Sequence, residues 1–121
     1  MSALTTRRQL GDAGEELAAS ALKRQGYKIL ERNYLAPLGE IDLIARQGKA
    51  LVFIEVKTRR GERFGAPQEA VSLNKQNKLR RLADYYLKEK RLGAEELVRF
   101  DVVAITISED GPRVEIIQEA F

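Results

Sequence analysis

The sequence lacks histidine and cysteine altogether, and these two absences narrow the chemistry open to the chain. Without histidine there is no serine–histidine pair, no imidazole zinc ligand and no imidazole general base. Without cysteine there is no disulfide and no thiolate metal site, which fits a cytoplasmic protein. Any catalysis must therefore come from carboxylates, lysine, hydroxyl groups or a metal ion with its water.

Long hydrophobic runs are also missing. No stretch approaches the roughly 18–20 apolar residues of a membrane span, so no contact with a membrane is expected. The first residues, Met-Ser-Ala-Leu-Thr-Thr-Arg-Arg, have no apolar stretch behind their positive charges, so no secretory signal is expected either. With 121 residues, 44% hydrophobic and 32% charged, the chain suits one globular domain over residues 1–121, with residues 1–10 as a loosely ordered arm.

The positive charge is unevenly distributed along the chain. Residues 57–91 contain eleven Lys and Arg against four Asp and Glu, a net charge of +7, whereas the remainder is net negative. Such a basic segment favours binding to a polyanion, although the exposed face of a solvated helix has the same composition. The candidate nucleic-acid-binding residues are Arg59, Arg60, Arg63, Lys75, Lys78 and Arg81.

Two β-prone runs, residues 40–46 and 50–58, flank a short polar break and predict an antiparallel hairpin. Charged residues interrupt both strands: Asp42 in the first, and Glu55 and Lys57 in the second. Because residues i and i+2 of a strand share one face, Glu55 and Lys57 project together, and Asp42 can lie near them across the hairpin.

Carboxylates in such apolar strands are costly unless they are paired or bind a cation. Asp42 and Glu55 therefore predict a site for a hard divalent ion, Mg²⁺ or Mn²⁺, with the carbonyl oxygen of Val56 as a further ligand. The ion would polarise a phosphate and activate water, while Lys57 would orient or deprotonate that water or stabilise the pentavalent phosphate. The alternative is a buried salt-bridge cluster with no metal.

The remaining elements follow from periodicity and capping signals. We expect a first helix over 12–25 with Asp12 as its N-cap, which puts Glu15 and the solvent-facing Glu16 in its first turn. A strand over 27–34, a loop over 35–38, a helix over 72–91 capped by Ser72, and strands over 97–108 and 113–118 complete the prediction, and residues 59–67 form a basic loop. The order α-β-β-β-α-β-β indicates an α/β fold, a mixed sheet flanked by helices.

Three further groups of polar residues have structural explanations that we favour over catalytic ones. Glu40 shares a strand face with Asp42, and we expect it to form a salt bridge, to Arg32 or Lys57, rather than to act as an outer-sphere acid. Arg99 and Asp101 are expected to pair with each other within an otherwise apolar strand, and Tyr85 and Tyr86 to lie in the core instead of stacking on bases.

Several motifs carry a resemblance to known proteins. Asp42, twelve intervening residues and Glu55-x-Lys57 resemble the PD-(D/E)xK nuclease signature, with Ile41 where that signature has proline. Gly11–Glu15, Arg32–Tyr34, Gly39–Ile44, Phe53–Lys57 and Arg99–Val102 resemble the YraN family of small bacterial proteins. That family is similar in turn to the archaeal Holliday-junction resolvases.

The resemblance implies a restriction-endonuclease-like topology in which Glu15, as the first-helix glutamate of the resolvases, completes the metal site. It also implies a metal-dependent, structure-selective endonuclease acting on branched DNA in recombination or repair. No helix-turn-helix or zinc finger is present, which favours selection by DNA shape, and the two-fold symmetry of a four-way junction predicts a homodimer. A non-catalytic module that binds nucleic acid or a repair partner, and a nuclease for RNA or small nucleotides, remain as alternatives.

Overall fold

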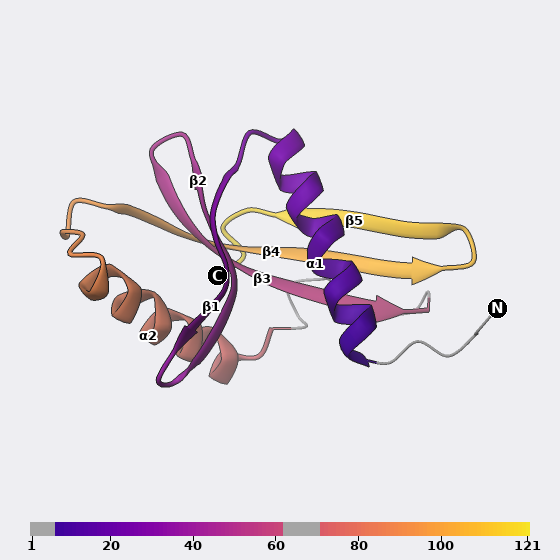
Figure 1. The fold of residues 1–121 in the computed structure, drawn as a ribbon, viewed down its shortest axis with the longest axis horizontal. Helices are drawn as coiled ribbons and strands as arrows, with labels where there is room; N and C mark the ends of the chain where they lie inside the picture. The colour runs from indigo at the N-terminus through magenta and orange to yellow at the C-terminus, as the bar shows by residue number, and fades with distance from the viewer. Residues whose placement is uncertain (1–6, 62–70) are drawn as a thin grey trace.

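The computed structural model describes residues 7–61 and 71–121, and for residues 7–10 only the backbone. Within these ranges, two helices and five strands follow one another in the order predicted from the sequence (Figure 1). They are α1 (Arg7–Arg24), β1 (Lys28–Ala36), β2 (Gly39–Gln47), β3 (Ala50–Arg60), α2 (Leu73–Glu89), β4 (Leu97–Ser108) and β5 (Gly111–Ile117). The α/β fold class and the mixed sheet flanked by helices are therefore confirmed. Within the described ranges, neither helix is long and apolar enough to cross a membrane.

The five strands form one mixed sheet in the spatial order β1-β2-β3-β4-β5. The first three strands are antiparallel neighbours, and the predicted hairpin closes between Gln47 and Ala50. β4 runs parallel to β3, and α2 lies in the connection between them, as a parallel pair requires a long crossover. β5 returns antiparallel to β4 and forms the second edge of the sheet.

The helices cover opposite faces of the sheet, because the side chains of β3 alternate between two separate cores. Val52 and Ile54 pack with Ala18 and Leu22 of α1. Phe53 packs in the other core, which α2 supplies with Leu79, Leu82, Ala83 and Tyr86. In Figure 1, α1 crosses in front of β3, β4 and β5, whereas α2 lies beside the β1–β2 hairpin.

Helix α2 agrees closely with its prediction. Ser72 caps it by accepting a hydrogen bond from the backbone N–H of Lys75 at 3.2 Å. Tyr86 is buried and makes edge-on contacts with the rings of Tyr34 and Phe53. The prediction that Tyr85 also lies in the core is wrong, because its side chain is 40% exposed. One residue along a helix turns about 100°, so adjacent tyrosines cannot both face the sheet.

Several predicted boundaries are wrong, and the first matters for the site. Helix α1 begins at Arg7, so Asp12 is not its N-cap and Glu15 lies in its middle rather than in its first turn. Gly11 costs a helix only about 1 kcal/mol, which does not prevent the helix from extending through it. The expected loop over 35–38 is shorter, since β1 continues to Ala36, and the last strand begins at Gly111. The basic loop expected over 59–67 does not begin at Arg59, because β3 continues to Arg60; positions 62–67 lie outside the described residues.

The β2–β3 pairing covers only part of the two strands. Their ladder runs from Gln47 opposite Ala50 to Leu43 opposite Ile54, whereas β2 stays paired with β1 down to Gly39. Figure 1 shows the consequence, because the β1–β2 hairpin crosses steeply over β3 instead of continuing beside it. Asp42 is thus the first residue of β2 beyond the point where the two strands part.

Candidate metal centre

Asp42 occupies the gap that opens between β2 and β3. Its carboxylate accepts a hydrogen bond from the backbone N–H of Val56 at 2.8 Å, so a side chain replaces the next bond of the ladder. In a strand the N–H and C=O of one residue point to the same side. The carbonyl oxygen of Val56 therefore lies on the edge of β3 that Asp42 occupies.

Three carboxylates from two elements converge at this gap. One oxygen each of Glu15 from α1, Glu40 and Asp42 from β2 lie within 4.8 Å of one another. Glu15 and Asp42 are half-buried and Glu40 is exposed, so the cluster opens to solvent on one side. The sequence prediction placed Glu15 and Asp42 together correctly, but it assigned Glu40 to a salt bridge instead of to this group.

Helix α1 approaches β3 closely at the residue before Glu15. Gly14 is buried, and a Cβ atom added to it would lie 2.0 Å from the Oγ1 atom of Thr58. Only glycine allows this separation, because real Cβ contacts are essentially never shorter than 3.0 Å. The close approach of helix and strand brings Glu15 within reach of Asp42.

Two consecutive residues of α1 also form polar contacts with two consecutive residues of β1. Arg32 forms an ion pair with Glu16, and the side chain of Asn33 hydrogen-bonds to Glu15. The expected bridge from Glu40 to Arg32 or Lys57 is therefore wrong: Arg32 pairs with Glu16, and Lys57 pairs with Glu55. The reason is geometric, since Glu16 is the neighbour of Glu15 on the helix that lies against β1.

Glu55 reaches Asp42 from the opposite face of the sheet, the one that α2 covers. It is 4% exposed, and two ammonium groups lie near its Oε2 atom: Lys57 Nζ at 3.6 Å and Lys75 Nζ at 3.7 Å. Glu55 and Lys57 thus project together as predicted. Lys75, a candidate nucleic-acid contact in the sequence, lies at this charged cluster, with its ammonium group beside Glu55.

Burial and neighbouring carboxylates raise the pKa values of Asp42 and Glu15. Burial, followed by the negative charge of Glu55, raises the pKa of Asp42 from 3.8 to about 7, against the lowering effect of the Val56 hydrogen bond. Burial and the charge of Asp42 likewise raise the pKa of Glu15 above its usual value, while its bond from Asn33 acts in the opposite direction. Acids whose pKa values are raised by burial and by the charge of a neighbouring carboxylate are suited to hold a cation, which would stabilise their ionised forms.

The other candidate cations lie around this cluster. Arg59 is half-buried and Arg60 exposed at the end of β3, and both follow Lys57 along that strand. Lys78 and Arg81 are exposed on α2, one and two turns beyond Lys75. Arg63 lies outside the described residues.

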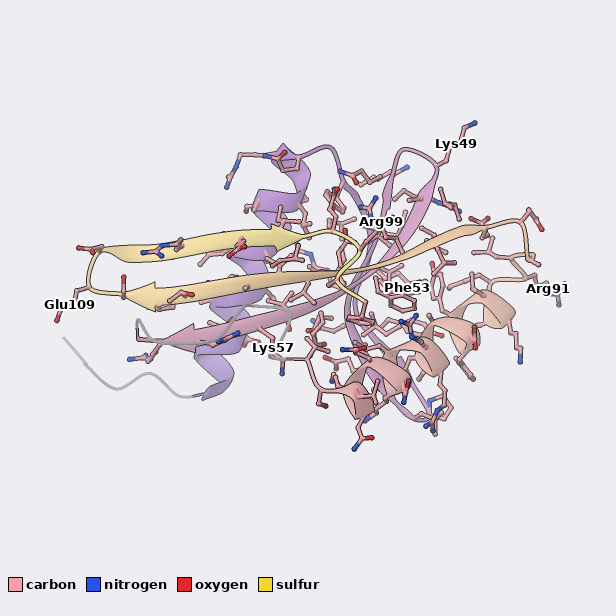
Figure 2. The ribbon with its side chains drawn as sticks, turned by 180° about the vertical axis from the view of Figure 1, so that it is seen from behind. Lys49, Phe53, Lys57, Arg91, Arg99 and Glu109 are labelled. Carbon is pink, nitrogen blue, oxygen red and sulfur yellow. The ribbon has the colours of Figure 1, made fainter. Side chains whose placement is uncertain are left out.

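Arg99 and Asp101 pair with each other, as predicted, in a separate network. Asp101 is fully buried and accepts bonds from Arg99 at 2.9 Å and from the Tyr27 hydroxyl at 2.6 Å. Gln47 and Gln118 complete the network. Figure 2 shows Arg99 and Lys57 well apart along the sheet, so this network does not belong to the carboxylate cluster. Among the described residues every buried side-chain polar atom has a partner.

Fold and site together define a mixed α/β protein with a carboxylate-rich cluster between the second and third strands. The profile of the family described as "Uncharacterised protein family UPF0102" matches residues 14–105. The chain belongs to this family, which is the YraN family that the sequence motifs resemble.

Relatives from several bacteria match the chain over nearly its whole length. A UPF0102 protein of Moorella thermoacetica is 52% identical over 96% of this chain and 98% of its own. One of Symbiobacterium thermophilum is 53% identical over 94% of this chain and 97% of its own, and one of Syntrophus aciditrophicus is 45% identical over 98% and 92%.

Proposed function

We propose that this protein is a metal-dependent, structure-selective DNA endonuclease that cuts branched DNA in recombination or repair, and therefore acts in the cytoplasm. The observation that carries the proposal is the convergence of Glu15, Glu40 and Asp42 within 4.8 Å, with Glu55 and two lysines beside them. Metal-dependent phosphodiester hydrolysis uses a divalent cation and gains from a positively charged side chain beside it; these carboxylates are suited to hold the cation, and the lysines supply the positive charge.

The donor set fits Mg²⁺ or Mn²⁺, because hard divalent cations prefer oxygen ligands. Glu15, Asp42 and Glu55 would hold the ion together with the carbonyl oxygen of Val56, and the position of Glu40 adds a fourth carboxylate to the predicted set. When bound, the ion would supply Lewis-acid polarisation of the scissile phosphate. The positive charge of such an ion would favour the ionised forms of Asp42 and Glu15, whose pKa values burial and neighbouring carboxylates raise.

Lys57 supplies the positive side chain. Its side chain is 36% exposed and its ammonium group lies 3.6 Å from Glu55, so it can reach both the cluster and a phosphate outside it. In this position Lys57 would orient the attacking water and stabilise the charge that develops on the phosphate.

The DNA path is proposed to run from the cluster over the basic segment. Lys75 lies at the cluster, Lys78 and Arg81 continue along the exposed face of α2, and Arg59 and Arg60 extend the surface along β3. Arg63 is proposed as a further contact from sequence alone. These contacts would bind the backbone without reading bases, and a four-way junction with two-fold symmetry would be cut symmetrically by a homodimer.

A second function has one observation in its favour. Lys57 and Lys75 already neutralise Glu55 without a metal, as expected of a non-catalytic module that binds nucleic acid or a repair partner. The Glu55→Ala variant separates the two functions. For an endonuclease, it should retain junction affinity within a few-fold in a gel-shift assay while cleavage in Mg²⁺ is lost. Wild-type protein that binds the junction but leaves it intact in both Mg²⁺ and Mn²⁺ would establish the binding module instead.

A further inference from the structure

Asn33 has an unusual backbone for a residue inside a strand. Its φ angle is +51°, in the left-handed region, although it lies in the middle of β1. The ladder pairs on either side are Arg32 with Leu43 and Tyr34 with Ile41, so Asn33 and Asp42 lie level with each other between two paired positions without forming a ladder pair themselves. Non-glycine residues at positive φ are uncommon, and such strained positions concentrate at functional sites.

The side chain of Asn33 provides the second observation. It hydrogen-bonds to Glu15 of α1, and Glu15 in turn lies within 4.8 Å of Asp42 and Glu40. One residue of β1 is therefore level with one member of the carboxylate cluster and contacts another through its side chain. The adjacent pair, Arg32 with Glu16, joins the same helix to the same strand, and neither of its residues is a member of the cluster.

We infer that Asn33 is a positioning residue of the carboxylate cluster: its left-handed backbone aims the side-chain amide at Glu15 and keeps that carboxylate pointed at the cation site. The inference rests on the proposed function in one respect, that the cluster binds a divalent cation. Carboxylate ligands are commonly held by such outer hydrogen bonds, and losing one typically weakens metal binding by about 10–100-fold.

The choice of side chain distinguishes this role from a purely structural one. If only the left-handed turn mattered, glycine would serve better, because it reaches positive φ without a steric cost. Aspartate tolerates the same backbone but would add a negative charge against Glu15. Asparagine is the residue that combines tolerance of this backbone with a neutral hydrogen-bond donor.

The decisive variant is Asn33→Gly, which keeps the backbone conformation and removes only the amide. Its melting temperature should equal or exceed that of the wild type, while its affinity for Mn²⁺, measured by calorimetry at pH 8, should fall by about 10–100-fold. Arg32→Gln is the matched control: it breaks the neighbouring helix–strand pair and should leave Mn²⁺ affinity unchanged. Unchanged affinity in Asn33→Gly, or an equal loss in Arg32→Gln, would overturn the inference.

A second readout does not require metal. Three-bond NMR couplings report the χ1 rotamer of Glu15, which should be single in the wild type and averaged in Asn33→Gly. If wild-type protein binds no Mn²⁺ but shows this difference, the metal site of the proposed function fails and the positioning by Asn33 stands. If the Glu15 rotamer is the same in both proteins, the positioning role is wrong whatever the metal affinity.

Discussion

The backbone N–H of Val56 donates a hydrogen bond to the carboxylate of Asp42 at 2.8 Å, at the point where β2 and β3 stop pairing. In a regular hairpin the two faces of the sheet would stay separate. Here the strands part, so Glu15 from the side of α1 and Glu55 from the side of α2 both reach Asp42. The gap in the sheet is therefore what assembles the cluster.

The raised pKa of Asp42 predicts a pH-dependent stability. Because its pKa rises from 3.8 to about 7 on folding, the folded state holds a proton that the unfolded state has released between about pH 4 and 7. The contribution of this group to stability thus falls as pH rises through that range. Asp42→Asn mimics the neutral acid and can still accept from Val56.

We therefore compare the free energies of unfolding of Asp42→Asn and wild type, measured in urea without metal. The difference in favour of Asp42→Asn should grow by on the order of 1–2 kcal/mol from pH 5 to pH 8. Asp84→Asn, at an exposed position of α2, controls for the loss of one negative charge. A difference between Asp42→Asn and wild type that is constant with pH would contradict a raised pKa at Asp42.

The contact of Lys75 with Glu55 predicts opposite effects on metal binding and on cleavage. The ammonium group lies 3.7 Å from the Glu55 carboxylate, where it competes with a cation for the same oxygen. At pH 8, Lys75→Met should bind Mn²⁺ several-fold more tightly and cut DNA more slowly, because it loses a proposed phosphate contact. Lys78→Met removes the same charge one turn away and should change Mn²⁺ affinity less. Unchanged or weaker Mn²⁺ binding by Lys75→Met would refute the competition.

The close approach of Gly14 to Thr58 predicts a compensating pair of substitutions. Alanine is normally the better helix residue by about 1 kcal/mol, but the added Cβ would lie 2.0 Å from Thr58 Oγ1. Gly14→Ala should therefore destabilise the protein by about 1–3 kcal/mol and weaken Mn²⁺ binding, since Glu15 is the next residue. Adding Thr58→Ala should recover part of both losses in thermal unfolding and calorimetry. A stabilising Gly14→Ala would show that the helix does not approach β3 this closely.

The buried Asp101 predicts a loss of stability without a loss of metal binding. Its removal would leave Arg99 without its carboxylate partner and Tyr27 without its acceptor, and breaking a buried pair on one side costs about 3–5 kcal/mol. Asp101→Ala should show this cost in urea unfolding, whereas the protein that remains folded should bind Mn²⁺ like the wild type. A specific loss of metal binding with little change in stability would connect this network to the site.

The fold was largely predictable because its signals are local. Alternation and the Gln47–Lys49 break predicted the hairpin, and Ser72 with the spacing of Leu79, Leu82 and Tyr86 predicted α2. The N-terminal boundary of α1 was missed because Asp12 looks like a cap in sequence, whereas the helix continues through Gly11.

The site was predictable where it depends on strand periodicity, and less so where it depends on tertiary contacts. The proximity of Glu55 and Lys57 follows from their i, i+2 spacing. Glu40 joins the cluster because β2 separates from β3, and Lys75 contacts Glu55 because of the way α2 packs on the sheet. Neither feature can be predicted from the order of the residues along the chain. Asn33 had one signal, a polar residue between Arg32 and Tyr34 within a strand, but its backbone angle required the structure.

The most direct test is cleavage of a labelled four-way junction by the wild type in Mg²⁺, in Mn²⁺ and in EDTA, beside Asp42→Ala and Lys57→Ala. We expect cutting by the wild type with either metal, none in EDTA, and a loss of at least about 100-fold in each variant, since each removes a group that the proposed reaction needs. A flap and a plain duplex of the same length report substrate preference. Wild-type protein that leaves all three substrates intact in both metals, or cutting that survives in both variants, would contradict the proposed nuclease.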